Sequence, residues 1–205
     1  MSPRQRDFSS RGTRPVTPDQ GKKREPERKR YWPLPGTEHT FPSEGKAGSF
    51  WEDRGDRHHA GLDLYAPAGT RVVSIEDGKV LSAGIFTSPD RVPYWNRTCQ
   101  VTIAHISGVF CRYAELRDVT VKAGREVDGG EIIGHVGEVL NLSLVGAGSP
   151  AYIRELKEQG RSSMLHLEAF TSAPGTDPEY QGGNWFSSRK PAHLADPARI
   201  LRDAV

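Results

Sequence analysis

Long apolar runs are missing from this sequence. Apolar residues make up 35% of its 205 residues, and the mean hydropathy is −0.61. No stretch approaches the roughly 18 consecutive apolar residues that predict a membrane-spanning helix. The first seven residues include basic side chains but no apolar core, which is not the pattern of a secretory signal. The sequence therefore predicts a protein that is made in the cytoplasm and does not bind membranes.

Cysteine is also scarce. The two residues, Cys99 and Cys111, lie on neighbouring segments that a tight turn near Gly108 connects. A disulfide between them would require strict geometry. Two reduced, buried thiols are the other interpretation.

Charge is unevenly distributed along the chain. Residues 1–31 hold ten Lys/Arg and four Asp/Glu, whereas the remainder holds 18 basic and 22 acidic residues. This proline-rich arm has too few apolar residues to offset the entropy of ordering it. It is either a solvated tail or a segment that orders against an acidic protein surface. Nucleic acid is not an expected partner, because no aromatic residue interrupts the basic run between residues 11 and 30.

The remaining residues, 32–205, are predicted to form one mainly β domain, an antiparallel sheet or sandwich. The 22 glycines and 15 prolines indicate many turns and short strands. Period-two alternation predicts two hairpins and two further short strands. These segments are 71–75 with 79–86, 99–105 with 109–116, 119–122, and 131–136.

Two short helices are predicted. Ser149 is the expected N-cap of the first helix, with Pro150 in its first turn, and Gly160 is its expected C-cap. Ile153 and Leu156 lie on one face of that helix. A second helix is expected over residues 197–203, after a long polar loop at 171–190.

Two alternating segments carry candidate metal ligands. In residues 57–64, His59 and Asp63 project from the same face of an extended chain. In residues 163–170, His166 projects from one face and the leucines from the other. Two histidines, one aspartate and an open fourth position are the pattern of a catalytic zinc site. The sequence therefore predicts one zinc ion bound by His59, Asp63 and His166.

Around these ligands the sequence resembles the lysostaphin/LytM-type zinc metallopeptidases, which have a duplicated hybrid motif fold and cut peptide cross-links of bacterial cell walls. The resemblance spans residues 32–201. Its segments are WPLPG at 32–36, HAGLDLYAPAGTRV at 59–72, the strands at 101–116 and 132–137, and LADPARIL at 194–201. It implies a LytM-type domain over residues 32–205, with insertions at about 140–162 and 171–190.

Two positions depart from the family pattern. The His-x-His motif reads Met164-Leu165-His166 here, and the Tyr-Ala-His-Leu motif has Glu115 in place of its histidine. The resemblance thus implies that both supporting catalytic histidines are replaced. Glu115 is either an exposed strand residue or a substitute general base. Met164 offers no proton chemistry and is expected to pack as an apolar plug.

Two aromatic pairs lie in loops, Tyr94-Trp95 and Trp185-Phe186. They either tether their loops to the core or flank a groove, where Tyr94, Trp95 and Trp185 would contact substrate.

Three functions are compatible with these observations. The first is a degenerate zinc-binding domain that serves as a binding or structural module with weak or no hydrolysis. The second is an active peptidoglycan endopeptidase with Glu115 as base, and the third is a metal-free scaffold. Peptidoglycan or a protein is the expected partner. Action outside the cytoplasm would require release by lysis or transport within a particle.

Overall fold

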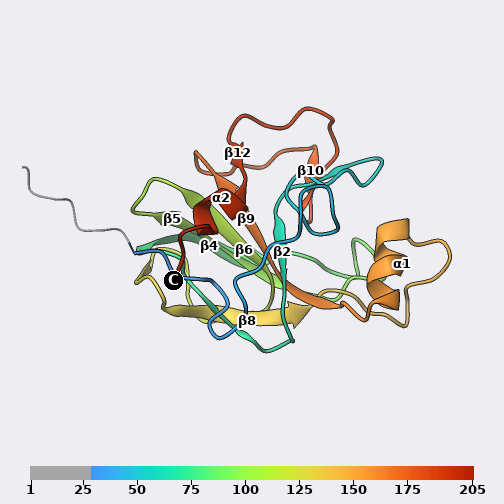
Figure 1. The fold of residues 1–205 in the computed structure, drawn as a ribbon, viewed down its shortest axis with the longest axis horizontal. Helices are drawn as coiled ribbons and strands as arrows, with labels where there is room; N and C mark the ends of the chain where they lie inside the picture. The colour runs from blue at the N-terminus through green and yellow to red at the C-terminus, as the bar shows by residue number, and fades with distance from the viewer. Residues whose placement is uncertain (1–28) are drawn as a thin grey trace, which may run out of the picture.

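The computed structural model describes residues 29–205. The expectations for residues 1–28 of the basic arm lie outside the described residues. The described part is built from short strands and two helices (Figure 1). The strands are β1 His58–His59, β2 Leu62–Tyr65, β3 Arg71–Val73, β4 Gly78–Ile85, β5 Cys99–His105, β6 Phe110–Val119, β7 Glu126–Val127, β8 Ile132–Glu138, β9 Ser163–Phe170, β10 Tyr180–Gln181, β11 Asn184–Trp185 and β12 Leu194–Ala195. The helices are α1 Ala151–Glu158 and α2 Pro197–Leu201.

A nine-stranded antiparallel sheet organises the domain around β9. Strands β2 and β12 pair with one edge of β9, and β6 and β8 pair with the other. From β6 the sheet continues through β5 and β4 to β7, while β3 pairs with β8. A separate three-stranded sheet has the order β1-β11-β10. The predicted mainly β, antiparallel fold is confirmed.

The main apolar core is built from the alternating residues of the central strands. Strand β9 is buried along nearly its whole length, because strands flank both of its edges and side chains cover both of its faces. Leu165 and Leu167 point into the main core, on the opposite face from His166. The alternation predicted for this strand is therefore confirmed: its leucines face the core and His166 faces the candidate site.

One predicted hairpin is wrong. Strand β3 pairs with β8, with Arg71 opposite His135, whereas β4 pairs with β5 and β7. The backbone of Ser74 is bonded to residues 130 and 131, which directs β3 towards β8 instead of β4. The hairpin of β5 and β6 is confirmed. No separate strand forms at residues 120–122, because β6 itself continues to Val119.

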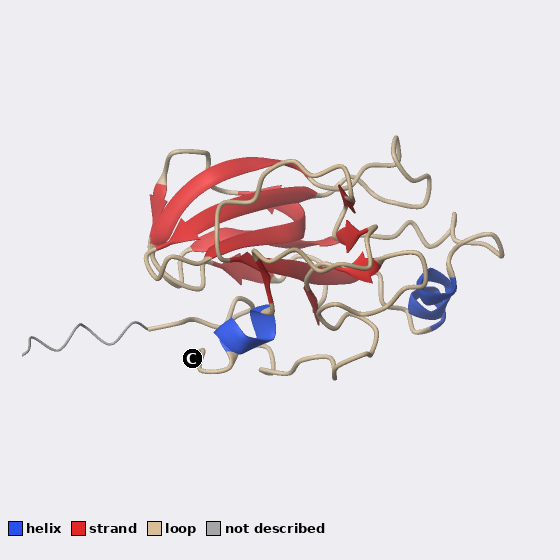
Figure 2. Cartoon of the chain, turned by 90° about the horizontal axis from the view of Figure 1, so that it is seen from above, coloured by secondary structure: helices blue, strands red, loops and turns tan. Residues whose placement is uncertain are grey.

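Both predicted helices form. In α1, Ile153 and Leu156 are buried as the periodicity indicates, although Pro150 and not Ser149 occupies the N-cap position. Gly160 follows the helix with φ +63°, a left-handed conformation that terminates it at low steric cost. The helices lie at separate places on the sheet, with α1 at one end (Figure 2). The predicted loop at 171–190 contains the short strands β10 and β11.

The two cysteines are free thiols. In the register of β5 and β6, Cys99 lies opposite Leu116, and Cys111 lies opposite Ile103. A disulfide would need the two cysteines to lie opposite each other. The register therefore excludes the disulfide and supports two reduced thiols. Across residues 29–205, no helix has the length and apolar character needed to cross a membrane.

Residues at the start of the described chain are tied to the domain. Arg30 forms a salt bridge with Glu76, whose side chain is 2% exposed. The amide of Tyr31 donates to the carbonyl of Ile75, and the amide of Val205 donates to the carbonyl of Arg30, each at 2.9 Å. We therefore propose that the folded domain begins near residue 29, slightly before the boundary expected from composition.

A pair of truncations tests this boundary. Removing residues 1–28 should leave the melting temperature unchanged, because their composition offers no core residues. Removing residues 1–31 should cost about 2 kcal/mol, since Glu76 would remain buried without its cation. For a domain of this size that corresponds to a melting temperature lower by roughly 4–8 °C in calorimetry. Equal melting temperatures for the two truncations would contradict the proposed boundary.

Candidate metal site

The predicted ligands meet on one face of the central strand pair. Asp63 on β2 lies directly opposite His166 on β9 in the antiparallel register. His59 is the last residue of β1. Two residues separate β1 from β2, and the side chain of His59 still points to the same site as that of Asp63. All three side chains are buried, with 1%, 4% and 4% exposure for His59, Asp63 and His166. The structure thus brings together residues that are 107 positions apart.

Hydrogen bonds on the outer side of each imidazole determine which nitrogen faces the centre. Nδ1 of His59 lies 2.8 Å from the carbonyl oxygen of Ser49, which can only accept. Nε2 of His166 lies 3.0 Å from the carboxylate of Glu168. Both outer nitrogens therefore donate, which leaves lone pairs on Nε2 of His59 and Nδ1 of His166.

Three acceptor atoms converge in the space between these residues. Nε2 of His59 is 3.0 Å from Nδ1 of His166, and Oδ1 of Asp63 is 3.2 Å and 2.9 Å from the same two nitrogens. Three lone pairs at these distances repel one another unless a cation or a proton lies between them. The donor atoms lie within 4.8 Å of one another, and two imidazoles with one carboxylate suit a divalent zinc ion. The residues present therefore fit a metal.

The pKa values of the three side chains are shifted by their burial and by one another's charges. Burial would lower the pKa of His166, but hydrogen bonds to Asp63 and Glu168 outweigh it and raise that pKa to about 9. Burial and the nearby Arg54 charge lower the pKa of His59. The neighbouring imidazoles hold the pKa of Asp63 well below its usual range, against the effect of burial. Positive charge at the centre of these three side chains is therefore favoured, from a proton or from a metal ion.

A buried carboxylate holds His166 in place. Glu168, two residues along β9, is fully buried and accepts hydrogen bonds from His166 and from the hydroxyl of Tyr180. Its second oxygen accepts a bond of 2.7 Å from Arg112, whose charge lowers the pKa of Glu168 against the effect of burial. A carboxylate behind a ligand histidine sets the ring orientation and raises ligand basicity.

Replacing Glu168 by glutamine should weaken zinc binding by about 10- to 100-fold, because the charge that orients His166 is lost. Competition with a chromophoric chelator measures the affinity. The matched control is Glu138→Gln on β8, where the carboxylate is exposed and accepts a hydrogen bond from Ser162. Unchanged zinc affinity in folded Glu168→Gln protein would show that Glu168 does not support the site.

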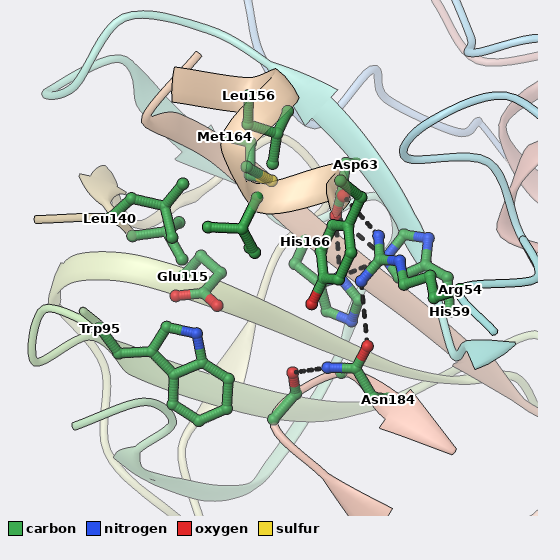
Figure 3. A pocket seen from close by; sticks show the side chains of 15 residues that line it. Arg54, His59, Asp63, Trp95, Glu115, Leu140, Leu156, Met164, His166 and Asn184 are labelled. Atoms are coloured by element: carbon green, nitrogen blue, oxygen red, sulfur yellow. Dashed lines mark hydrogen bonds and ion pairs between the residues drawn. The ribbon is translucent and has the colours of Figure 1, made fainter. Parts of the chain in front are cut away.

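Glu115 lines the same cavity as the three ligands (Figure 3). It is 5% exposed, and its Oε2 accepts hydrogen bonds from Thr98 and Thr87 at 2.6 Å and 3.1 Å. Burial raises its pKa to about 7 against the effect of these two bonds. Its φ of +60° is unusual for a residue with a side chain and lies next to a register shift in β6. The interpretation of Glu115 as an exposed strand residue is therefore wrong.

Met164 belongs to a second apolar cluster beside the cavity. The cluster comprises Trp95, Val139, Leu140, Val145, Ile153, Leu156 and Met164. Figure 3 shows Met164 beneath Leu156 of α1 and on the same side of the cavity as Leu140. The position at which the resemblance expects a histidine is thus packed against α1. A polar donor there would be buried among apolar side chains.

The hairpin of β10 and β11 closes the cavity from the other side. A side-chain atom added at Gly183 would lie 2.8 Å from the ring of His166, and one added at Gly182 would lie 2.7 Å from Trp95. The amide of Ala60 donates to the carbonyl of Gly183 at 2.9 Å. The cavity that remains has a volume of about 40 Å³. The three candidate ligands are therefore largely covered in this conformation.

The aromatic candidates take different places. Trp95 lines the cavity, and Tyr94 packs against the second apolar cluster. Trp185 is 4% exposed and pairs with Tyr180 and His193 at ring-centroid distances of 5.8 Å and 6.3 Å. It is absent from the residues that line the described cavity. A contact of these residues with substrate stays a prediction.

Sequence reasoning missed Glu168, Arg54 and Asn184 at this site. Glu168 had a signal, because it shares the face of His166 in an alternating strand. Arg54 and Asn184 had none, because each lies in a polar stretch of sequence without periodicity that could equally face water. Only the packing of the covering hairpin brings their side chains to the cavity.

Comparisons with known proteins show which sequences and structures this chain is similar to. The model of "Peptidase family M23" matches residues 57–168, more than half of the chain. The "Cell division protein DipM" of Caulobacter vibrioides is 32% identical over 112 residues, which cover 49% of this chain and 17% of that protein. A solved structure of "the antimicrobial peptidase lysostaphin from Staphylococcus simulans" is 21% identical, covers 87% of this chain and 55% of that one, and has a TM-score of 0.51. A "zinc containing peptidase from vibrio cholerae" is 28% identical and covers 55% of this chain and 26% of that one, with a TM-score of 0.36.

The likeness to lysostaphin shows the fold. The chain spans about a sixth of the length of DipM and about half of the lysostaphin chain, so the activities of these longer proteins are not carried over. The family match includes both alternating segments that hold the three converging side chains. The chain belongs to peptidase family M23.

Proposed function

We propose that this chain is a zinc-binding M23 domain that recognises peptidoglycan peptides and hydrolyses them weakly or not at all. One zinc ion would be held by Nε2 of His59, Oδ1 of Asp63 and Nδ1 of His166. The convergence of these three acceptors supports the metal site most directly. The lysostaphin/LytM resemblance supports peptidoglycan as the substrate class.

Weak hydrolysis follows from what surrounds the ligands. When bound, zinc supplies Lewis-acid activation of water and of a peptide carbonyl. The chain must add a base for the proton and a donor for the developing oxyanion. Met164 lies where the resemblance expects one of these groups, and it is packed in the second apolar cluster. Loss of one oxyanion donor typically costs about 10²- to 10³-fold in rate.

Covering of the ligands supports a binding role further. A cavity of about 40 Å³ holds a few water molecules but not a peptide bond with its flanking residues. A peptide would therefore bind on the surrounding surface or require displacement of the hairpin of β10 and β11. We expect zinc in this domain to stabilise the fold and the covering segments more than it promotes turnover.

Glu115 favours a second candidate, an active endopeptidase. Its carboxylate lines the ligand cavity, and its pKa of about 7 suits a general base near neutral pH. Oε2 is engaged by the two threonines, which leaves Oε1 available for a proton. This candidate predicts turnover that is lost in Glu115→Gln protein with zinc retained.

Metal content and cleavage of purified peptidoglycan, measured on the same preparation, test the proposal. We expect about one zinc per chain, as in single-metal sites, and release of peptide ends near the limit of detection. A protein purified without chelator that holds no zinc would contradict the metal site. Rapid cleavage that Glu115→Gln abolishes would replace the binding role with the endopeptidase.

A further inference from the structure

A buried arginine contacts the candidate ligand Asp63. The guanidinium of Arg54 lies 3.6 Å from Oδ2 of Asp63, and its side chain is only 8% exposed. Oδ1 of the same carboxylate faces the two imidazole nitrogens. The two oxygens of Asp63 therefore have separate partners, one towards the metal position and one towards Arg54 (Figure 3).

Arg54 is itself held from three sides. Its Nε and Nη2 donate to Oε2 of Glu52 at 3.2 Å and 3.1 Å, and its Nη1 donates to Oδ1 of Asn184 at 3.0 Å. Its guanidinium carbon lies 4.6 Å from the ring centroid of Tyr152 on α1. These contacts fix the plane of the guanidinium relative to β11 and α1, the two elements that cover the site.

The partners of Arg54 distinguish between two roles. A guanidinium has five N–H donors, and here Glu52 and Asn184 take three of them while a fourth is available to Asp63. Little capacity remains for a substrate group. The planar fork of arginine is suited to holding several acceptors in one fixed geometry, which the point charge of lysine cannot do.

We propose that Arg54 is a positioning residue that holds Asp63 with a single oxygen directed at the metal. This inference rests on the metal site proposed above. Through its ion pair with Oδ2, Arg54 would keep Asp63 from binding the metal through both oxygens and would align Oδ1 with the two imidazoles. Because Arg54 also bonds Asn184, the same side chain connects a metal ligand to the hairpin of β10 and β11.

Zinc affinity and the spectrum of the cobalt-substituted protein test this role. Arg54→Met should weaken zinc binding by about 10- to 100-fold in chelator competition, the usual cost of losing a group that orients a ligand. Its cobalt absorption should also change, since Asp63 becomes free to bind through two oxygens. Arg54→Lys should fold, bind zinc less tightly than the wild type and show a changed cobalt spectrum. The control Arg117→Met, an exposed arginine paired with Asp118, should match the wild type in both measurements.

The outcomes separate this inference from the metal site itself. A wild-type protein without zinc affinity overturns the metal site and this inference with it. Folded Arg54 variants that bind zinc within twofold of the wild-type affinity and have unchanged cobalt spectra would overturn only the role of Arg54. If Arg54→Met does not fold, Arg54→Lys decides by the same two measurements. Circular dichroism and melting of each metal-free variant establish which proteins are folded.

Discussion

Replacing Glu115 and Met164 together by histidine should raise hydrolysis of peptidoglycan peptides by at least about 10²-fold. The two histidines would restore a base and an oxyanion donor beside the three ligands, and each such donor is typically worth about 10²- to 10³-fold. Release of new peptide ends from purified peptidoglycan measures the rate. The single replacements should each give a smaller gain, because the two groups act in one step.

Controls for this double replacement address folding and access. Histidine at position 164 would be buried among apolar side chains, at a cost of about 1–3 kcal/mol that calorimetry can follow. The same pair of replacements combined with His166→Ala should be inactive. A double variant that is folded and binds zinc but remains inactive would contradict the prediction. It would indicate that the insertion and the hairpin of β10 and β11 exclude peptide.

Replacing His166 by alanine should abolish zinc binding and the stability that zinc confers. With zinc at 1,000 times its dissociation constant, the wild type should gain about 4 kcal/mol. For a domain of this size the melting temperature should rise by roughly 8–16 °C. His166→Ala removes one of three ligands, so it should show neither a shift nor retained metal in elemental analysis.

The matched control is His135→Ala. His135 on β8 is partly exposed and pairs with Asp118, away from the three converging acceptors. The His135→Ala protein should show the same zinc-dependent rise in melting temperature as the wild type. One zinc per chain in purified His166→Ala protein would show that the metal binds elsewhere.

Local patterns in the sequence determined which face of each strand carries the site. Alternation in residues 163–170 places His166 opposite Leu165 and Leu167, and the structure has this division. The spacing of Ile153 and Leu156 predicted the buried face of α1 in the same way. These predictions hold because side-chain direction follows from the backbone period alone.

Partners across the sheet were decided only by the tertiary structure. The pattern of residues 71–86 is compatible with a hairpin, yet β3 pairs with β8. Likewise, alternation cannot reveal that Asp63 lies opposite His166. The sequence pattern of a strand predicts that the segment is extended and which of its faces is apolar. The choice of neighbour depends on contacts between residues far apart in the chain.

The environment of each polar group was also decided by packing. The sequence showed that Glu115 and Met164 depart from the family pattern, but not that one lies in the ligand cavity and the other in an apolar cluster. Arg54 occurs in a run of charged residues that resembles a solvated turn. Its burial results from the hairpin and α1 closing over it. Charge in a sequence is local, whereas desolvation and pairing of that charge depend on which distant segments cover it.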